Sequence, residues 1–144
     1  MKILVLQGPN LNLLGLKSSQ SGKKLTLDKL NKEMRRHVRN THVELKILQT
    51  HKQYIALNFI QRNRNQADGL VLIPTSWARY DWTLAETLKL VKLPTSIVYF
   101  DDPYDFSTPE KDSILSNLAS QSFTGTPIET CIEALDHIIG LCSD

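Results

Sequence analysis

Two segments of the chain gather side chains that could bind or transform a small molecule. They combine carboxylates, a guanidinium, indoles and phenols: Trp77, Arg79, Tyr80, Asp81, Trp82, Asp101, Asp102, Tyr104 and Asp105. Because the carboxylates outnumber the one cation, they favour a ligand that is cationic or weakly acidic. The same residues are also typical of a polar loop with anchoring aromatics, or of an interface between subunits. Their role depends on where the fold places the two segments.

Standard signatures of nucleotide, metal and nucleophile chemistry are absent from the sequence. No G-x-G-x-x-G or G-x-x-x-x-G-K-[S/T] pattern occurs, so we expect no standard nucleotide cradle. The four histidines are scattered, and none has metal-ligand spacing to a cysteine or a carboxylate. No G-x-S-x-G nucleophile elbow is present either. We therefore predict that the protein uses no cofactor and holds no metal.

Strand-like and helix-like periodicities alternate along the chain. Short apolar or alternating runs predict five strands, over residues 2–6, 43–49, 70–73, 96–100 and 120–124. Apolar spacing of three and four residues predicts four helices, over residues 27–38, 52–65, 83–91 and from 127 onward. The last begins with a capping Thr126, a proline at its first position and a capping-box Glu129. Residues 7–22 and 101–111, rich in turn-forming types, predict long loops.

This order of elements predicts an α/β fold. Short connections and right-handed crossovers give a parallel sheet with helices on both faces, a three-layer sandwich. Five strands in a chain of this length fit the flavodoxin-like strand order 2-1-3-4-5. Such sheets bind ligands at the carboxyl ends of their strands, so the loops after Leu6, Ile73 and Phe100 are the candidate site.

The composition describes one ordinary globular domain spanning residues 1–144. With 41% apolar and 22% charged residues, it excludes a disordered tail, a fibrous repeat and a disulfide scaffold. No apolar run approaches the roughly 18 residues that a membrane span needs, and the first residues are too short a stretch for a secretory signal. Cys131 and Cys142 fall on one predicted helix, too far apart to bond each other. We predict a cytoplasmic protein with reduced thiols and no membrane contact.

Charge is divided unequally between the two halves of the chain. Residues 1–72 contain 13 Lys and Arg against 4 Asp and Glu, whereas residues 73–144 contain 4 against 11. This division is consistent with solvated helix faces, with a basic face for an anionic partner, or with complementary surfaces in an oligomer. The basic stretch 23–39 has no interleaved aromatics for base stacking, so nucleic acid is not the expected partner.

An eight-residue stretch directly after the first strand is the most specific feature of the sequence. It reads Gly8-Pro9-Asn10-Leu11-Asn12-Leu13-Leu14-Gly15 and resembles the signature that follows strand 1 in type II dehydroquinases (type II 3-dehydroquinate dehydratases). The resemblance continues through residues 67–74, 83–88 and 93–94, and the order of elements agrees to the C-terminus. It therefore covers nearly the whole chain.

The resemblance implies a flavodoxin-like fold, assembled from trimers and often as a dodecamer. It also implies a reaction of the shikimate pathway, the trans loss of water from 3-dehydroquinate to give 3-dehydroshikimate. That reaction proceeds through an enolate without a cofactor. Family members use a tyrosine base on the loop after strand 1, an arginine beside it, an asparagine-held water and a histidine acid.

On the base side of the site, the resemblance places the family's residues as follows. The enolate-side asparagine falls on Asn10, which is retained. The loop arginine falls on Lys17, which keeps the charge but loses the planar fork. The tyrosine base falls near Ser21, and no tyrosine occurs between residues 1 and 53. Gln7 replaces the asparagine before the signature.

On the acid side and around the substrate ring, the resemblance places further departures. The acid histidine falls on Tyr99 and its preceding glutamate on Ile97. The third-strand asparagine falls on Ile73, and the histidine of the following loop falls on Arg79. Thus Asn10, Lys17 and Tyr99 occupy catalytic positions, but the base and the imidazole acid are replaced.

The substrate-binding positions change in charge as well. The carboxylate-side serine falls on Asp101, and the downstream arginine falls on Glu110. The aspartate that a neighbouring subunit contributes falls on Glu86. We add Ser76, Tyr80 and Asp81, on the loop after the third strand, to Gln7, Arg79, Glu86, Asp101 and Glu110 as candidate ligand-binding residues.

These departures predict a family member whose dehydratase activity is absent or very weak, an inactive or repurposed copy. Two alternatives stay open. In one, the protein is a working dehydratase with a rearranged site, in which Tyr80 or Tyr99 acts as base beside Arg79 or Lys17. In the other, it is a structural or regulatory subunit that binds a different small ligand, alone or with an active paralogue.

Overall fold

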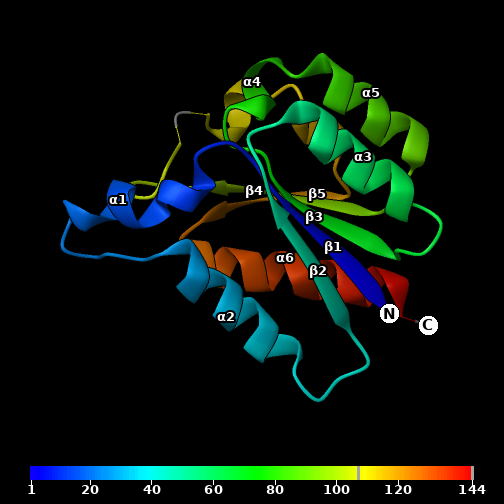
Figure 1. Cartoon of the computed structure of the whole chain (residues 1–144), viewed down its shortest axis with the longest axis horizontal. Coiled ribbons are helices and arrows are strands. Elements are labelled where there is room, and N and C mark those ends of the chain that lie inside the picture. Colours follow the sequence, from blue (N-terminus) through cyan, green and yellow to red (C-terminus); the bar gives the residue numbers. More distant parts are fainter. Residues whose placement is uncertain (107, 144) are drawn as a thin grey trace.

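The computed structural model describes residues 1–106 and 108–143 and contains one parallel sheet of five strands. The strands are β1 (Lys2–Gln7), β2 (Glu44–Gln49), β3 (Gly69–Ile73), β4 (Thr95–Phe100) and β5 (Gln121–Gly125). Their order in the sheet is β2-β1-β3-β4-β5, and every neighbouring pair is parallel. The predicted fold class and strand order are therefore confirmed (Figure 1).

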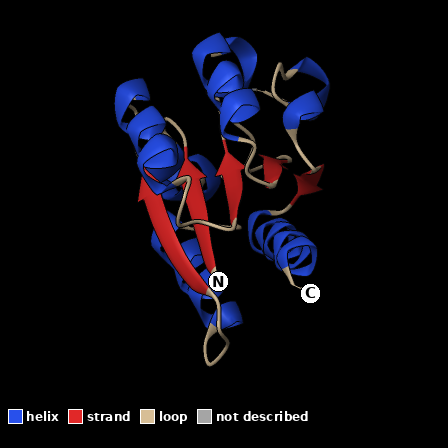
Figure 2. Cartoon of the chain, turned by 90° about the vertical axis from the view of Figure 1, so that its right-hand side faces the viewer, coloured by secondary structure: helices blue, strands red, loops and turns tan. Residues whose placement is uncertain are grey.

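Helices cover both faces of the sheet and give the three layers (Figure 2). One face is covered by α2 (Leu27–Val38) and α6 (Pro127–Cys142), and the other by α3 (Gln53–Asn63) and α5 (Trp82–Val91). Strands β3 and β4 are buried at every position, as expected for a sheet covered on both sides. The carboxyl ends of the strands remain as the edge where loops can build a site.

The segment predicted as a loop over residues 7–22 is partly helical, which corrects the sequence interpretation. Residue 7 extends β1, and the rest includes the 3₁₀ helix η1 (Leu11–Leu13) and the short helix α1 (Leu14–Ser19). The physical reason is tertiary: Leu11 and Leu14 are fully buried in the core beneath α2, although their neighbours are turn-forming residues. This helix shapes the site that follows β1.

Smaller differences concern the starts of helices and the loop after β4. A one-turn helix, α4 (Trp77–Tyr80), precedes α5, and the 3₁₀ helices η2 (Glu110–Asp112) and η3 (Ser116–Leu118) lie before β5. Thr126 is the N-cap residue of α6, but its hydroxyl contacts the Glu129 carboxylate at 3.5 Å and makes no capping bond to the backbone. The predicted capping box is therefore incomplete.

No helix in residues 1–106 and 108–143 is long and apolar enough to cross a bilayer. Both cysteines are free thiols on α6, as predicted from their spacing. Cys131 is fully buried, and burial raises the pKa of its thiol. The core therefore contains an un-ionised thiol that packs as a small apolar group.

Candidate functional site

The end of β1 is held against β3 through Gly8. The Gly8 amide donates a hydrogen bond to the Ile73 carbonyl at 2.8 Å. A Cβ at this position would lie 2.3 Å from the Pro74 carbonyl oxygen, closer than van der Waals contact permits. Glycine is therefore required by the close approach of two backbones at the strand edge.

The next two residues are fixed by loops that follow β2 and β3. The Thr75 hydroxyl donates to the Pro9 carbonyl at 2.8 Å, and the backbone N–H of Asn10 donates to His51 Nδ1 at 3.1 Å. Asn10 adopts a left-handed conformation, with φ of 69°, and its side chain does not cap η1. The backbone of Asn10 is thus fixed at the strand edge while its amide side chain is left for another partner.

A pocket of about 440 Å³ opens beside this loop. Its lining residues come from the loop after β1, from η1 and α1, and from the loop after β4: Asn10, Leu13, Leu16, Lys17, Gln20 and Phe106. The pocket brings together Asn10 and Lys17, two of the three residues predicted at catalytic positions. Its volume lies in the range typical of small-molecule sites.

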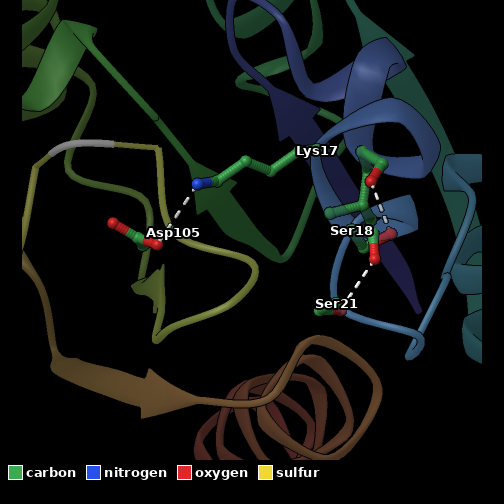
Figure 3. Close-up of polar contacts among 5 residues, drawn as sticks. Lys17, Ser18, Ser21 and Asp105 are labelled. Carbon is green, nitrogen blue, oxygen red and sulfur yellow. Dashed lines mark hydrogen bonds and ion pairs between the residues drawn. The ribbon is translucent and has the colours of Figure 1, made fainter.

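An ion pair joins the two sides of this region. Lys17 Nζ lies 3.6 Å from the Asp105 carboxylate, so α1 and the loop after β4 are connected through their side chains (Figure 3). Both side chains are about two-fifths exposed, which makes the pair a weak contact in energy. The charge of Lys17 is nevertheless locally balanced by a carboxylate.

Two serines hold the end of α1. The buried Ser18 hydroxyl donates to the Leu14 carbonyl at 2.8 Å and accepts from the Leu25 amide at 2.8 Å. The Ser21 hydroxyl donates to the Ser18 carbonyl at 2.7 Å (Figure 3) and accepts from the Lys23 amide at 3.2 Å. Ser21, near which the resemblance places the base, thereby fixes the turn after α1.

Tyr99, which stands where the resemblance places the acid, lies away from the open pocket. Only 4% of the residue is exposed, and its hydroxyl donates to Ser113 Oγ at 2.6 Å. Burial raises the pKa of the Tyr99 phenol; the Ser113 bond lowers it less, and Glu110 adds a smaller rise. The adjoining cavity has a volume of about 10 Å³, room for one water. A six-membered substrate ring has no room beside this phenol.

Two predicted ligand-binding residues are used inside the fold. Gln7 is fully buried, and its amide donates to Asn31 Oδ1 of α2 at 2.7 Å. Asp81 is 2% exposed and is the N-cap of α5, where its carboxylate accepts from the Leu84 amide at 2.9 Å and from Gln53 Nε2 at 2.6 Å. These hydrogen bonds stabilise helix packing, and neither residue lines the pocket.

The remaining predicted ligand-binding residues lie outside the pocket. Arg79 lies 4.0 Å from the Asp112 carboxylate, and Tyr80 is 58% exposed beside it in α4. Glu86 is on the exposed side of α5. The loop positions are Ser76, which is half-buried, and the exposed Asp101 and Glu110. The structure therefore does not gather these residues around one ligand within a single chain.

His51 and the apolar lining residues were not anticipated from the sequence. His51 follows β2, and the carboxyl end of β2 lies beside that of β1 in the sheet, which is the signal that could have found it. Leu13, Leu16 and Phe106 had no comparable signal, because each stands in a segment interpreted as loop. No three His, Cys, Asp or Glu residues of the described chain are grouped as metal ligands.

Comparisons with known proteins agree with this architecture. The chain is 26% identical to a 3-dehydroquinate dehydratase of Halothermothrix orenii, over 97% of this chain and 95% of the relative. It is 32% identical to a 3-dehydroquinate dehydratase of Carboxydothermus hydrogenoformans, over 72% of this chain and 68% of that protein.

Solved structures show the same fold. A type II dehydroquinase from Butyrivibrio crossotus superposes with a TM-score of 0.84 at 22% identity, over 96% of this chain and 97% of that one. A 3-dehydroquinate dehydratase-like protein from Bifidobacterium longum superposes with a TM-score of 0.71 at 22% identity, over 100% and 99%. The family model for dehydroquinase class II matches residues 1–139. The chain therefore belongs to the dehydroquinase class II family.

Proposed function

We propose that this protein is a dehydroquinase class II family member that does not turn over 3-dehydroquinate at an enzymatic rate. In this proposal the pocket beside the β1 loop binds a small molecule without dehydrating it. The family reaction needs one group that removes a proton next to a ketone and another that protonates a leaving hydroxyl. Activity therefore depends on which groups this chain offers for the two proton transfers.

The observation that carries the proposal is the state of two hydroxyls. The resemblance places the base near Ser21 and the acid on Tyr99. Each donates its proton inside the protein, to the Ser18 carbonyl and to Ser113 Oγ respectively. Both transfers would first have to break a hydrogen bond that holds a loop. Loss of a positioned general base alone costs about 10²–10⁴ in rate.

The imidazole next to the pocket does not replace the missing base. His51 Nδ1 accepts the hydrogen bond from the Asn10 amide, so a neutral His51 ring carries its proton on Nε2. In this tautomer Nε2–H can donate a hydrogen bond, but the ring has no free nitrogen to accept a proton. His51 therefore fits a role in positioning the Asn10 loop.

Charge also opposes the family substrate, which is a carboxylate. The resemblance places Asp101 and Glu110 where a serine and an arginine hold that group, and both are exposed acids in the loop after β4. Two like charges about 4 Å apart repel by about 4 kcal/mol at an effective dielectric constant near 20. This repulsion supports the loss of the family substrate at these positions; neither acid lines the pocket beside the β1 loop.

The test is a direct turnover measurement. Purified protein is mixed with 3-dehydroquinate, and the enone product is followed by its ultraviolet absorbance, with the Carboxydothermus hydrogenoformans relative as a positive control. We expect kcat/KM to be lower than that of the relative by about 10² or more. Comparable turnover would contradict the proposal. Tyr80→Phe and Tyr99→Phe would then show which phenol serves a rearranged site.

A second part of the proposal is self-association, which exposed apolar side chains support. The exposed face of α4 and α5 carries large apolar side chains, Tyr80 at 58%, Trp82 at 68% and Leu90 at 75% exposure. Exposed aromatics of this size favour contact with another protein surface. We propose a homo-oligomer built on trimers, and light scattering of the protein alone tests it: a monomeric mass at all concentrations would contradict this assembly.

A further inference from the structure

Three of the six residues that line the pocket beside the β1 loop are large and apolar. Leu16 is 68% exposed and Leu13 is 44% exposed, and the half-buried Phe106 lies in the same lining. Large apolar side chains left open around a pocket of about 440 Å³ favour a ligand with a hydrocarbon or aromatic part.

The charges next to these walls are one cation and one anion. Lys17 lines the pocket, and its ion-pair partner Asp105 (Figure 3) directly precedes the lining residue Phe106. In the described chain neither side chain has a second ion-pair partner. Because a half-exposed pair of this kind contributes about 0–1 kcal/mol, a ligand can separate the two charges at little cost.

Two side-chain amides complete the polar part of the lining. Asn10 and Gln20 both line the pocket, and in residues 1–106 and 108–143 neither side chain makes an intramolecular hydrogen bond. Each amide offers two N–H donors and a carbonyl acceptor. They can therefore donate hydrogen bonds to a carboxylate and accept hydrogen bonds from an ammonium group.

We propose that this pocket binds an α-amino acid with a large apolar side chain, in its zwitterionic form. The ligand carboxylate pairs with Lys17, the ammonium group pairs with Asp105, and the side chain packs against Leu16 and Phe106. This assignment rests on the proposed function, because it gives the ligand class of a pocket that no longer serves dehydration.

Charge balance makes the assignment specific. A simple carboxylate would gain Lys17 but would face the Asp105 carboxylate, whereas a simple amine would gain Asp105 but would face Lys17. A zwitterion satisfies both groups and replaces one ion pair with two. The apolar walls then select among zwitterions by the size of the side chain, so phenylalanine should bind more tightly than alanine.

The first experiment compares three matched probes by isothermal titration calorimetry. These are L-phenylalanine, 3-phenylpropanoate, which lacks the ammonium group, and 2-phenylethylamine, which lacks the carboxylate. We expect phenylalanine to bind about tenfold more tightly than either fragment, the effect of one charged hydrogen bond. Equal or tighter binding of a fragment, or no binding of phenylalanine, would overturn the assignment.

Variants locate the site. Lys17→Met and Asp105→Asn should each weaken phenylalanine binding about tenfold, and the swapped pair Lys17→Asp with Asp105→Lys should restore part of it. The control is Lys32→Met, which removes a lysine from the exposed face of α2 and should leave binding unchanged. Unchanged binding in Lys17→Met and Asp105→Asn would overturn the assignment, since both side chains are half-exposed and the variants are expected to fold.

The turnover assay on the same preparations separates this inference from the proposed function. Absence of turnover together with absence of phenylalanine binding contradicts only the amino-acid assignment. Efficient turnover of 3-dehydroquinate contradicts the proposed function itself, whether or not phenylalanine binds. Absence of turnover with selective binding of the zwitterion supports both.

Discussion

The loops after β1 and after β4 begin at the same edge of the sheet, where the strands end, but they are held in place differently. At the β1 end, Gly8, Pro9 and Asn10 are fixed through backbone groups: Gly8 by β3, Pro9 by Thr75, and Asn10 by His51. At the β4 end, Asp101, Asp102 and Glu110 are exposed. The family signature after β1 is held by backbone contacts that the fold requires, whereas in the loop after β4 acids replace the family's substrate-binding residues at exposed positions.

This comparison explains how a family signature can persist without the family chemistry. Glycine is needed at position 8 by the approach of Pro74, whatever the pocket binds. An exposed loop residue such as Asp101 has no such constraint, because changing it costs the fold little. The signature after β1 therefore reports on architecture, and the reaction must be argued from the side chains in the pocket.

The largest expected effect on stability comes from forcing apart the carboxyl ends of β1 and β3. Gly8→Ala places a methyl group 2.3 Å from the Pro74 carbonyl oxygen, so the two strand ends must separate. We expect the free energy of unfolding to fall by about 3 kcal/mol, measured by urea denaturation. The matched control is Gly140→Ala on α6, where nothing lies within 4 Å of the added carbon and helix propensity predicts a gain of up to about 1 kcal/mol. Equal effects of the two changes would show that the β1 end is not constrained.

The next effect in size concerns the cap of α5. Asp81→Ala removes the acceptor of the Leu84 amide and of Gln53 Nε2, both at a buried position. We expect a loss of about 2 kcal/mol in the free energy of unfolding. The control is Glu133→Ala, which removes an exposed carboxylate from α6 and should change stability by less than about 0.5 kcal/mol. A neutral Asp81→Ala variant would reopen a ligand-binding role for this carboxylate.

The contrast between the β1 and β4 ends of the sheet also shows why the fold was predictable from the sequence and much of the site was not. Continuous apolar runs such as residues 70–73 fix a buried strand, and topology rules then fix the sheet order. The helix α1 was missed because its stability comes from burying Leu14 and from the Ser18 hydrogen bonds, not from local propensity. Long-range packing of this kind leaves no periodic pattern in a six-residue segment.

At the site, the sequence located the correct edge but not the direction of the side chains. Asn10 and Lys17 were found because a motif fixed their place after β1. Asp81 was predicted as a ligand-binding residue because it stands on the loop after the third strand, whereas α5 begins at Trp82 and makes Asp81 the helix cap. A helix start one residue earlier than expected therefore changed a candidate site residue into a structural one.

At the β4 end, the Tyr99 hydroxyl gives a smaller effect that depends on pH. Tyr99→Phe removes the bond to Ser113, and we expect a loss of about 1 kcal/mol at neutral pH. Burial raises the pKa of Tyr99 above its ordinary value of 10.0, so the unfolded phenol ionises at lower pH than the folded one. This contribution is therefore fully present below about pH 10 and is lost as pH rises through the folded pKa.

The measurement is urea denaturation of the wild type and of Tyr99→Phe at neutral pH and above pH 10. Because phenylalanine cannot ionise, the variant should lose less stability than the wild type on going to alkaline pH. An identical alkaline loss in both proteins would contradict a buried, hydrogen-bonded Tyr99. It would also bring back the alternative in which this phenol is open to the pocket and acts as a base.

The smallest effect on stability is expected for the Lys17–Asp105 ion pair, which joins the segments after β1 and after β4. Lys17→Met and Asp105→Asn each remove one partner of a half-exposed pair 3.6 Å apart, so the free energy of unfolding should change by less than about 0.5 kcal/mol. A double-mutant cycle, followed by urea denaturation at low and high salt, measures the coupling between the two residues, which should be small and should fall with salt. A coupling above about 1.5 kcal/mol would mean that Lys17 and Asp105 hold the β4 loop in place. A ligand would then have to pay that cost to part them, whereas weak coupling leaves both charges available for binding.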